Sequence, residues 1–276
     1  MIYIRTLPNG KPQVIKDQAF CSLLNNSIPI HNKSFDELFD KMDAEVYDNA
    51  DVTKQAMSNV HGDWYEWLLA VAAWNYSANN QSANLPLLMP NISQFDVASL
   101  YEERLFDLIQ DLRKKVEDSS EVKLITSNPD FVIINREVIN SEIGELTEID
   151  NLTTETISEL SNKFRQFENK CDFSQVEGYI AVKKSLRPDR RLQIPHEGSL
   201  MKAIYKHLQT REWIVNPKGL KYYAMASSVS DADKNALKTV ATHSITTVSS
   251  LPQAAVDDVF QIDSIQQAQY VFQQIL

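Results

Sequence analysis

The sequence predicts an α/β fold, with a central mixed sheet flanked by helices and a helical N-terminal extension. Short apolar runs of strand type alternate with longer segments whose apolar residues recur at helical spacing, and this alternation is typical of α/β domains. The 276 residues suffice for one large domain with a full core, and 43% hydrophobic content is ordinary for a globular protein. We expect a single domain over residues 1–276, with residues 1–60 as an extension for scaffold or subunit contact and 61–276 as the core.

Helices are predicted wherever apolar residues repeat at intervals of three and four. In the extension, Ser34 stands three residues before Glu37 and suits the cap of a helix over residues 36–42. Glu197 falls near the start of a further helix, whose apolar residues continue to Leu208. The remaining predicted helices are residues 61–71, 105–116, 153–171, 252–260 and 264–276.

Strands are predicted from apolar runs bounded by turn residues. These runs are residues 85–90, 122–126, 131–134, 178–182, 221–226 and 244–248. Asp130 immediately precedes one of them, and Lys183 immediately follows another, at positions where chemistry is often mounted. A plain turn is the alternative for Asn128-Pro129-Asp130, because these residues suit turns by themselves.

Charge is distributed unevenly along the chain. Residues 181–223 carry ten basic and three acidic side chains, a net charge of +7, whereas the whole chain has −10. This polarisation suits an acidic body that holds a basic cleft for phosphates, since a few Lys and Arg contacts supply most of the affinity for a nucleic-acid backbone. A solvated helix face is the alternative for a basic run.

Within that stretch, Arg187-Pro188-Asp189-Arg190 combines two planar guanidinium groups with one acceptor around a stiff proline. Arg donates two parallel hydrogen bonds to guanine O6 and N7, and Asp accepts from cytosine N4, each contact giving about 1–3 kcal/mol of base discrimination. Arg187, Asp189 and Arg190 are therefore candidate readers of C·G pairs.

Candidate catalytic residues follow in the order Asp130, Lys183 and Glu197. Two acids and a lysine at the ends of neighbouring strands could hold a divalent metal by oxygen ligands and orient a water toward a phosphodiester. Glu66 lies among the aromatic residues of the predicted helix over 61–71, and from its surroundings alone a solvent-facing or lysine-paired side chain is favoured.

Several classes of protein are excluded. The sequence has no apolar run of bilayer length and no signal-peptide core, so we expect a soluble, cytoplasmic protein with no membrane partner. Cys21 and Cys171 are too few and too far apart for a disulfide framework or a metal site. The six glycines form no phosphate-binding loop, and no Gly-x-Ser-x-Gly nucleophile motif occurs.

Three motifs resemble the PD-(D/E)xK type II restriction endonucleases that recognise sites with a CCGG core, especially those that cut RCCGGY. They are Ser127-Asn128-Pro129-Asp130, the run KKSLRPDRRLQ over 183–193, and His196-Glu197-Gly198. The resemblance covers roughly residues 60–275, and the first sixty residues match poorly.

The resemblance implies roles for individual residues. The metal-binding carboxylates of the family fall on Asp130 and Glu197, and its catalytic lysine falls on Lys183, with the adjoining Lys184 as the alternative. The upstream active-site acid falls on Glu66, which reverses the interpretation from its surroundings. The family's readers of the CCGG core fall on Arg187, Asp189 and Arg190, in agreement with base-edge chemistry.

One position departs from the superfamily pattern. The usual second acid lies two residues before the lysine, where this chain has Ala181, so Glu197 would have to supply that carboxylate from the following helix. If Glu197 points elsewhere, the metal site fails.

The implied activity is Mg²⁺-dependent double-strand cleavage of DNA at R/CCGGY in the bacterial cytoplasm, leaving a 5′ CCGG overhang. A palindrome calls for a homodimer, and the family suggests a tetramer built from two dimers, with residues 211–213 as a candidate contact. One rival is a protein that binds CCGG without cutting, because Ala181 leaves the site one acid short. Another is a structure-selective nuclease of the same superfamily. The outer base pair, the number of metals and the number of subunits stay open.

Overall fold

The central feature is a five-stranded mixed sheet, seen in a computed structural model that describes residues 3–90, 95–120, 123–124, 128–245 and 251–276. Its strand order is β3-β4-β5-β6-β7, with antiparallel pairing from β3 to β5 and parallel pairing from β5 to β7. The strands are β3 (Leu85–Leu88), β4 (Phe131–Ile134), β5 (Val176–Lys183), β6 (Lys221–Ala226) and β7 (Asp258–Gln261). The predicted α/β class with a mixed sheet is confirmed.

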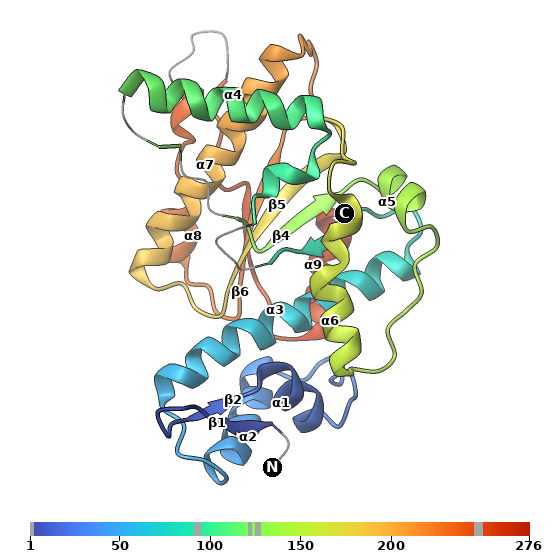
Figure 1. Cartoon of the computed structure of the whole chain (residues 1–276), viewed down its shortest axis with the longest axis vertical. Helices are drawn as coiled ribbons and strands as arrows, with labels where there is room; N and C mark the ends of the chain where they lie inside the picture. Colours follow the sequence, from blue (N-terminus) through green and yellow to red (C-terminus); the bar gives the residue numbers. More distant parts are fainter. Residues whose placement is uncertain (1–2, 91–94, 121–122, 125–127, 246–250) are drawn as a thin grey trace.

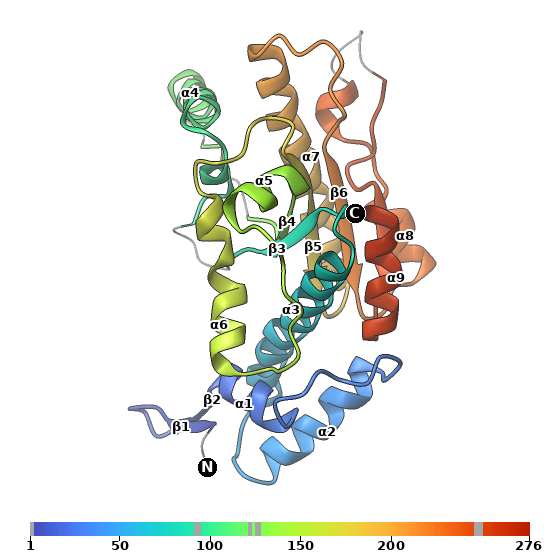
Figure 2. The same cartoon turned by 90° about the vertical axis from the view of Figure 1, so that its right-hand side faces the viewer.

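Helices cover the sheet, and strands β3 and β4 are buried along their whole length. The helices after the N-terminal segment are α3 (Lys54–Asn79), α4 (Glu103–Ser120), α5 (Arg136–Glu142), α6 (Thr154–Asn162), α7 (Pro188–Arg211), α8 (Asp231–Leu237) and α9 (Ile265–Ile275). Helix α3 packs on β3, β5 and α9, whereas α7 packs on β6, α4 and α8 (Figures 1 and 2). Burial on both faces explains why β3 and β4 read as continuous apolar runs rather than alternating ones.

The N-terminal segment lies at one end of the molecule, and α4 lies at the other (Figure 1). It consists of an antiparallel hairpin, β1 (Ile4–Thr6) and β2 (Pro12–Val14), followed by α1 (Lys16–Leu23) and α2 (Phe35–Tyr47). The Ser34 side chain accepts from the Glu37 amide at 3.3 Å, so the predicted helix cap is confirmed. Helix α3 runs continuously through the expected boundary at residue 60.

Helix α7 begins at Pro188, so the expected helix start near Glu197 is wrong. Arg187 is extended and Pro188 occupies the first turn, where proline has no lost hydrogen bond and a suitable φ. Glu197 therefore lies in the middle of the helix, and one rigid element carries both it and the predicted base readers.

Two further elements differ from prediction. The helix expected over 153–171 ends at Asn162 and continues as a 3₁₀ turn over Lys163–Phe167. The helix expected over 252–260 is wrong, because Asp258–Gln261 pairs in parallel with β6 as strand β7. A short apolar run does not by itself distinguish strand from helix, and here the adjoining strand edge decides.

Two predicted strands fall mainly outside the described residues. Within 244–248, only residues 244–245 are described, and they belong to a 3₁₀ turn (Thr242–Ile245). Within 122–126, only Lys123 and Leu124 are described, and neither is in a strand. In the part of the chain that the structure describes, no helix combines the length and apolar character needed to cross a membrane.

Candidate active site

Asp130 and Lys183 meet at the ends of β4 and β5. Asp130 Oδ2 accepts hydrogen bonds from the Val182 amide at 2.6 Å and from Lys183 Nζ at 2.7 Å. The two side chains are only 11% and 21% exposed. Among the described residues, both hydrogen bonds to this carboxylate end on Oδ2, which leaves Oδ1 available for another ligand.

The backbone around Asp130 is fixed by its neighbours. Its carbonyl accepts from the Met89 amide at 2.8 Å, which continues the pairing of β3 with β4. The Asn128 side chain donates to the Phe95 carbonyl at 2.6 Å and accepts from the Val97 amide at 3.0 Å. The Asn-Pro-Asp motif therefore aims the carboxylate from a rigid support rather than only turning the chain.

Glu66 reaches this pair from α3. The pKa of Glu66 is raised to about 8, mainly by burial and then by the charge of Asp130, while the charge of Lys183 opposes the rise. Glu66 is therefore mostly withdrawn from solvent and within electrostatic reach of both Asp130 and Lys183.

Glu197 is buried in the middle of α7, with 5% of the residue exposed. Its Oε2 accepts from the Tyr222 hydroxyl at 3.0 Å, and its Oε1 accepts from Gln193 Nε2 at 2.7 Å. Tyr222 is fully buried in β6. Burial raises the pKa of Tyr222 well above its usual value, and the charges of Glu197 and Asp130 add to this. Tyr222 thus lies within electrostatic reach of both predicted metal-binding acids.

Gly198 allows α7 to approach β6 this closely. A Cβ atom at this position would lie 2.3 Å from the Ala255 carbonyl oxygen and 3.0 Å from the Tyr222 ring. The glycine of the His-Glu-Gly motif is therefore a packing requirement, and it brings Glu197 within reach of Tyr222. Ala181, the position of the superfamily's usual acid, is a 1% exposed core residue in β5.

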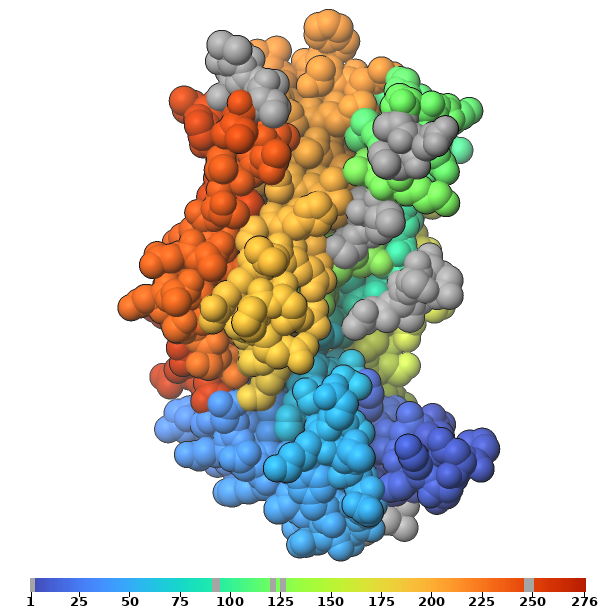
Figure 3. Space-filling model, turned by 90° about the vertical axis from the view of Figure 1, so that its left-hand side faces the viewer, coloured from blue at the N-terminus to red at the C-terminus, as the bar shows by residue number. Residues whose placement is uncertain are grey.

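The three predicted base readers lie together at the first turn of α7. Asp189 lies between the two arginines, with Oδ1 3.7 Å from Arg187 Nε and Oδ2 3.6 Å from Arg190 Nε. The Arg187 and Asp189 side chains are 60% and 62% exposed, and Arg190 is 30% exposed. Figure 3 shows this part of the chain, in gold, at the surface beside the N-terminal segment.

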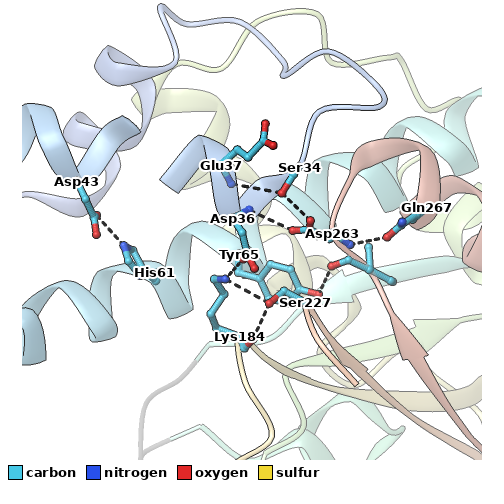
Figure 4. A network of polar contacts seen from close by, with 11 residues as sticks. Ser34, Asp36, Glu37, Asp43, His61, Tyr65, Lys184, Ser227, Asp263 and Gln267 are labelled. Carbon is cyan, nitrogen blue, oxygen red and sulfur yellow. Dashed lines mark hydrogen bonds and ion pairs between the residues drawn. The ribbon is translucent and has the colours of Figure 1, made fainter. Parts of the chain in front are cut away.

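The Lys184 side chain contacts α2 and not Asp130. Its Nζ pairs with Asp36 of α2 and lies 3.2 Å from Ser227 Oγ (Figure 4). The same atom lies 5.5 Å from the centroid of the Phe39 ring. Lys183 is the last residue of β5 and Lys184 is the first residue after it, and their side chains contact different elements. Of the two lysines left open by the sequence, Lys183 is the one that contacts Asp130.

Hydrogen bonds to Asp263, which follows β7, also connect the N-terminal segment to the sheet. Asp263 accepts from Ser34 Oγ at 2.6 Å and from the Asp36 amide at 3.1 Å (Figure 4). On the other side of α2, Asp43 pairs with His61 of α3 at 2.7 Å. Helix α2 is thus held both to the end of β5, through Lys184, and to α3, through His61.

Many of the cations in the basic stretch over residues 181–223 pair with acids from elsewhere in the chain. Lys202 is 4% exposed and bonds Asp257 at 2.6 Å, and Arg191 bonds Asp233 of α8 at 2.6 Å. Further pairs are Lys184 with Asp36, Lys218 with Glu177, Lys221 with Asp257 and Arg211 with Asp111. Counting charges along the sequence could not reveal these partners, since each is distant in the chain.

Sequence reasoning missed Gln193 and Tyr222, the two partners of Glu197. Gln193 precedes Glu197 by four residues, which is a contact spacing on a helix and could have indicated the pair. Tyr222 had no such signal, because only the pairing of β6 with β5 places it below α7.

Carboxylate oxygens are the ligands that Mg²⁺ prefers, and Asp130, Glu197 and Glu66 could supply them. No three His, Cys, Asp or Glu side chains converge into a metal-binding cluster within the described ranges. Asp130 instead bonds Lys183, and Glu197 bonds Gln193 and Tyr222. Each Glu197 oxygen carries one of these hydrogen bonds and keeps a lone pair for a further partner.

The chain is similar in sequence and in fold to known restriction endonucleases. The family described as Cfr10I/Bse634I restriction endonuclease matches residues 5–276. Over 218 residues, the chain is 45% identical to the type II restriction enzyme Cfr10I of Citrobacter freundii, covering 78% of this chain and 76% of that protein.

Two solved structures are similar over nearly the whole chain. The type IIF restriction endonuclease Bse634I with cognate DNA is 34% identical with a TM-score of 0.88, and a second Bse634I structure is 35% identical with the same score. Each comparison covers 99% of this chain and 97% of the other. The similarity therefore includes the first sixty residues, which the sequence motifs alone did not cover. The chain belongs to the Cfr10I/Bse634I restriction endonuclease family and is a type II restriction enzyme, a site-specific deoxyribonuclease.

Proposed function

We propose that this enzyme makes Mg²⁺-dependent double-strand cuts in DNA at a palindromic site with a CCGG core, R/CCGGY, and leaves a 5′ CCGG overhang. The observation that carries the proposal is the Asp130–Lys183 pair at the ends of β4 and β5, beside a helix that bears both Glu197 and the candidate base readers. Family membership supports the reaction class, and the arginine-rich turn supports the C·G core.

Asp130 and Glu197 are the proposed metal ligands, and Glu66 is the supporting acid. Bound Mg²⁺ supplies polarisation of the phosphate and a lowered pKa for the attacking water. Lys183 is held by Asp130 Oδ2, so its ammonium group can orient that water or offset charge that builds on the phosphate. Asp130 Oδ1 and the remaining lone pairs of Glu197 are the atoms left to bind a cation.

Arg187, Asp189 and Arg190 are the proposed readers of the CCGG core. Their exposure leaves the donors and acceptor of the first turn of α7 open to base edges in a major groove. The solved structure of Bse634I contains its cognate DNA, which supports double-stranded DNA as the partner of this fold.

A two-fold palindrome is matched by a homodimer, and we propose that two dimers associate into a tetramer through residues 211–213. Trp213 is 88% exposed, which is unusual for a large apolar side chain and suits a subunit contact. Light scattering of Trp213→Ala tests this step, since a tetramer held by this residue would fall to a dimer. We place the enzyme in the bacterial cytoplasm, where its DNA substrate lies.

The test of the activity is incubation with plasmid DNA that contains RCCGGY sites, in Mg²⁺ or in EDTA, with Asp130→Asn as the comparison. We expect discrete linear fragments with CCGG overhangs in Mg²⁺ only, and none from the variant. Sequencing of the fragment ends identifies the outer base pair. Ends at other sequences would contradict the proposed site, and retarded but uncut DNA in every condition would contradict the proposed catalytic residues.

A further inference from the structure

A continuous set of hydrogen bonds joins a candidate base reader to a candidate metal-binding acid along α7. Arg190 Nη1 donates to Gln193 Oε1 at 2.5 Å, and Gln193 Nε2 donates to Glu197 Oε1 at 2.7 Å. From β6, the Tyr222 hydroxyl donates to Glu197 Oε2 at 3.0 Å. The amide of Gln193 thus lies between the part of the helix that is exposed to DNA and the part that is buried in the site.

The helix itself brings these side chains together. Residues 190, 193 and 197 are three and four positions apart, so they project from the same face of α7. An amide accepts a hydrogen bond at its oxygen and donates one from its nitrogen at the same time. A carboxylate at position 193 could not donate to Glu197, and an ammonium group could not accept from Arg190.

Both carboxylate oxygens of Glu197 are held, and by different elements. Tyr222 is fully buried in β6 and holds Glu197 Oε2, and this bond does not involve the exposed first turn of α7. A carboxylate that is held at one oxygen only can still rotate about its last bond, because that torsion is broad. The bond from Gln193 to the second oxygen therefore sets the plane of the carboxylate, and this bond depends on a residue that also contacts Arg190.

We propose that Gln193 is a positioning residue that couples base reading by Arg190 to the orientation of Glu197; the inference rests on the proposed function. Arg190 has five N–H donors, so it can bond a base edge with some of them while Nη1 keeps the Gln193 amide oriented. At an incorrect base pair, Arg190 shifts, and the Gln193 amide oxygen loses the hydrogen bond that it accepts from Arg190. The amide can then turn, and Glu197 loses the hydrogen bond that fixes the plane of its carboxylate. Incorrect sites are then penalised in cleavage beyond their penalty in binding.

The experiment uses Gln193→Met in the full-length enzyme, with Gln209→Met as the matched control. Gln209 lies on the same helix and also bridges two groups, accepting from Lys206 Nζ at 2.8 Å and donating to the Ile214 carbonyl at 2.9 Å. It is twelve residues beyond Glu197, so its loss tests for a general disturbance of α7. Thermal unfolding checks that both variants are folded.

Two quantities are measured for each protein on the cognate duplex and on duplexes with one central base pair replaced. One is the dissociation constant in Ca²⁺, and the other is the single-turnover cleavage rate in Mg²⁺. For the wild type, we expect a replaced pair to lower the rate by more than it weakens binding. For Gln193→Met, we expect cognate cleavage to fall about 10- to 100-fold, since a hydrogen bond to a charged group is lost.

We further expect the Gln193→Met dissociation constant for cognate DNA to change little, and its additional cleavage penalty at replaced base pairs to disappear. The Ca²⁺ concentration that half-maximally tightens DNA binding should rise in this variant, which gives a measurement independent of cleavage. Gln193→Glu should behave like Gln193→Met, because it keeps an acceptor for Arg190 but cannot donate to Glu197. Gln209→Met should match the wild type.

Wild-type cleavage and discrimination in Gln193→Met would overturn the inference, and so would equal losses in binding and cleavage. Failure of the proposed function has a different signature. In that case the wild type itself would leave RCCGGY sites uncut in Mg²⁺, or Asp130→Asn would still cut them.

Discussion

The two sides of the β5 end differ sharply, although adjacent lysines supply both. On one side, Lys183 bonds Asp130, and the charges of these two groups act on the pKa of Glu66 in opposite directions. On the other side, the Lys184 side chain bonds Asp36 and lies over the Phe39 ring. The Lys184 backbone carbonyl accepts a hydrogen bond from Ser227 Oγ. The first side places two acids, Asp130 and Glu66, around one lysine, whereas the second pairs one lysine with one acid.

The two sides thus have different tasks: the first carries the candidate catalytic residues, and the second holds α2 against the end of β5. Lys183 is the last residue of β5 and Lys184 follows it, and the two side chains have different partners, so one residue can serve the proposed chemistry while its neighbour holds α2 to the end of the strand. The second side thus gives the N-terminal segment a direct contact with the end of β5. We expect substitutions on the first side to reduce cleavage strongly and those on the second side to leave cleavage nearly unchanged.

The largest effect is expected in the cleavage rate, when Lys183 and Lys184 are each replaced by methionine in separate variants. Lys183→Met should lower single-turnover cleavage by about 100- to 1,000-fold, because a preorganised cation near the reacting phosphate is lost. Lys184→Met should change the cleavage rate by only a few fold. Equal rates for the two variants, measured at saturating DNA, would show that the assignment of Lys183 is wrong.

Gly198→Ala should have the next largest effect. Its Cβ would clash with the Ala255 carbonyl oxygen and the Tyr222 ring, and overpacking of this kind costs about 1–3 kcal/mol in the free energy of unfolding. Cleavage should also fall, since α7 must move away from β6 with Glu197. Urea unfolding measures the stability change.

Gly62→Ala is the matched control for that substitution. Gly62 lies within α3, and a Cβ there meets nothing within 4 Å. Glycine inside a helix costs about 0.5–1 kcal/mol relative to alanine, so this variant should be more stable than the wild type. If both glycine variants lost stability equally, close packing at Gly198 would not be the cause.

Lys184→Met should destabilise the fold by about 1–2 kcal/mol through the lost ion pair and the lost contact with the Phe39 ring. In the same denaturation experiment, Lys183→Met should also lose stability, because it leaves the buried Asp130 carboxylate without its cation. The comparison between the two sides therefore depends on cleavage, which only Lys183→Met should reduce by orders of magnitude.

The smallest effect is expected for the pair energy between Lys184 and Asp36. Their side chains are 25% and 52% exposed, and such pairs are worth about 0.2–1 kcal/mol because solvent screens them. A double-mutant cycle of Lys184→Met with Asp36→Asn isolates this term. A coupling free energy near zero would assign the anchoring of α2 to Phe39 and Asp263 instead.

Motifs in the chain predicted the site better than they predicted its surroundings. The position of Asp130 before a strand and of Lys183 at a strand end followed from local apolar runs, and both are confirmed. The base-reader turn followed from side-chain chemistry alone, and its assignment to DNA stays a prediction. Glu197 was a candidate from its residue type and order in the chain, whereas the role of Glu66 came only from the family resemblance, because its aromatic surroundings favoured a structural side chain.

By itself, the sequence determined the α/β class, most of the strands, the Ser34 cap and the family, because these depend on local spacing and on contiguous motifs. Tertiary structure alone decided that β7 is a strand, that Lys183 and not Lys184 contacts Asp130, and that Gln193 and Tyr222 hold Glu197. It also decided which cations of the basic stretch are paired with acids. The physical reason is that hydrogen bonds, ion pairs and pKa shifts depend on distance in space, and the partners in each case lie on different elements or on facing turns of one helix.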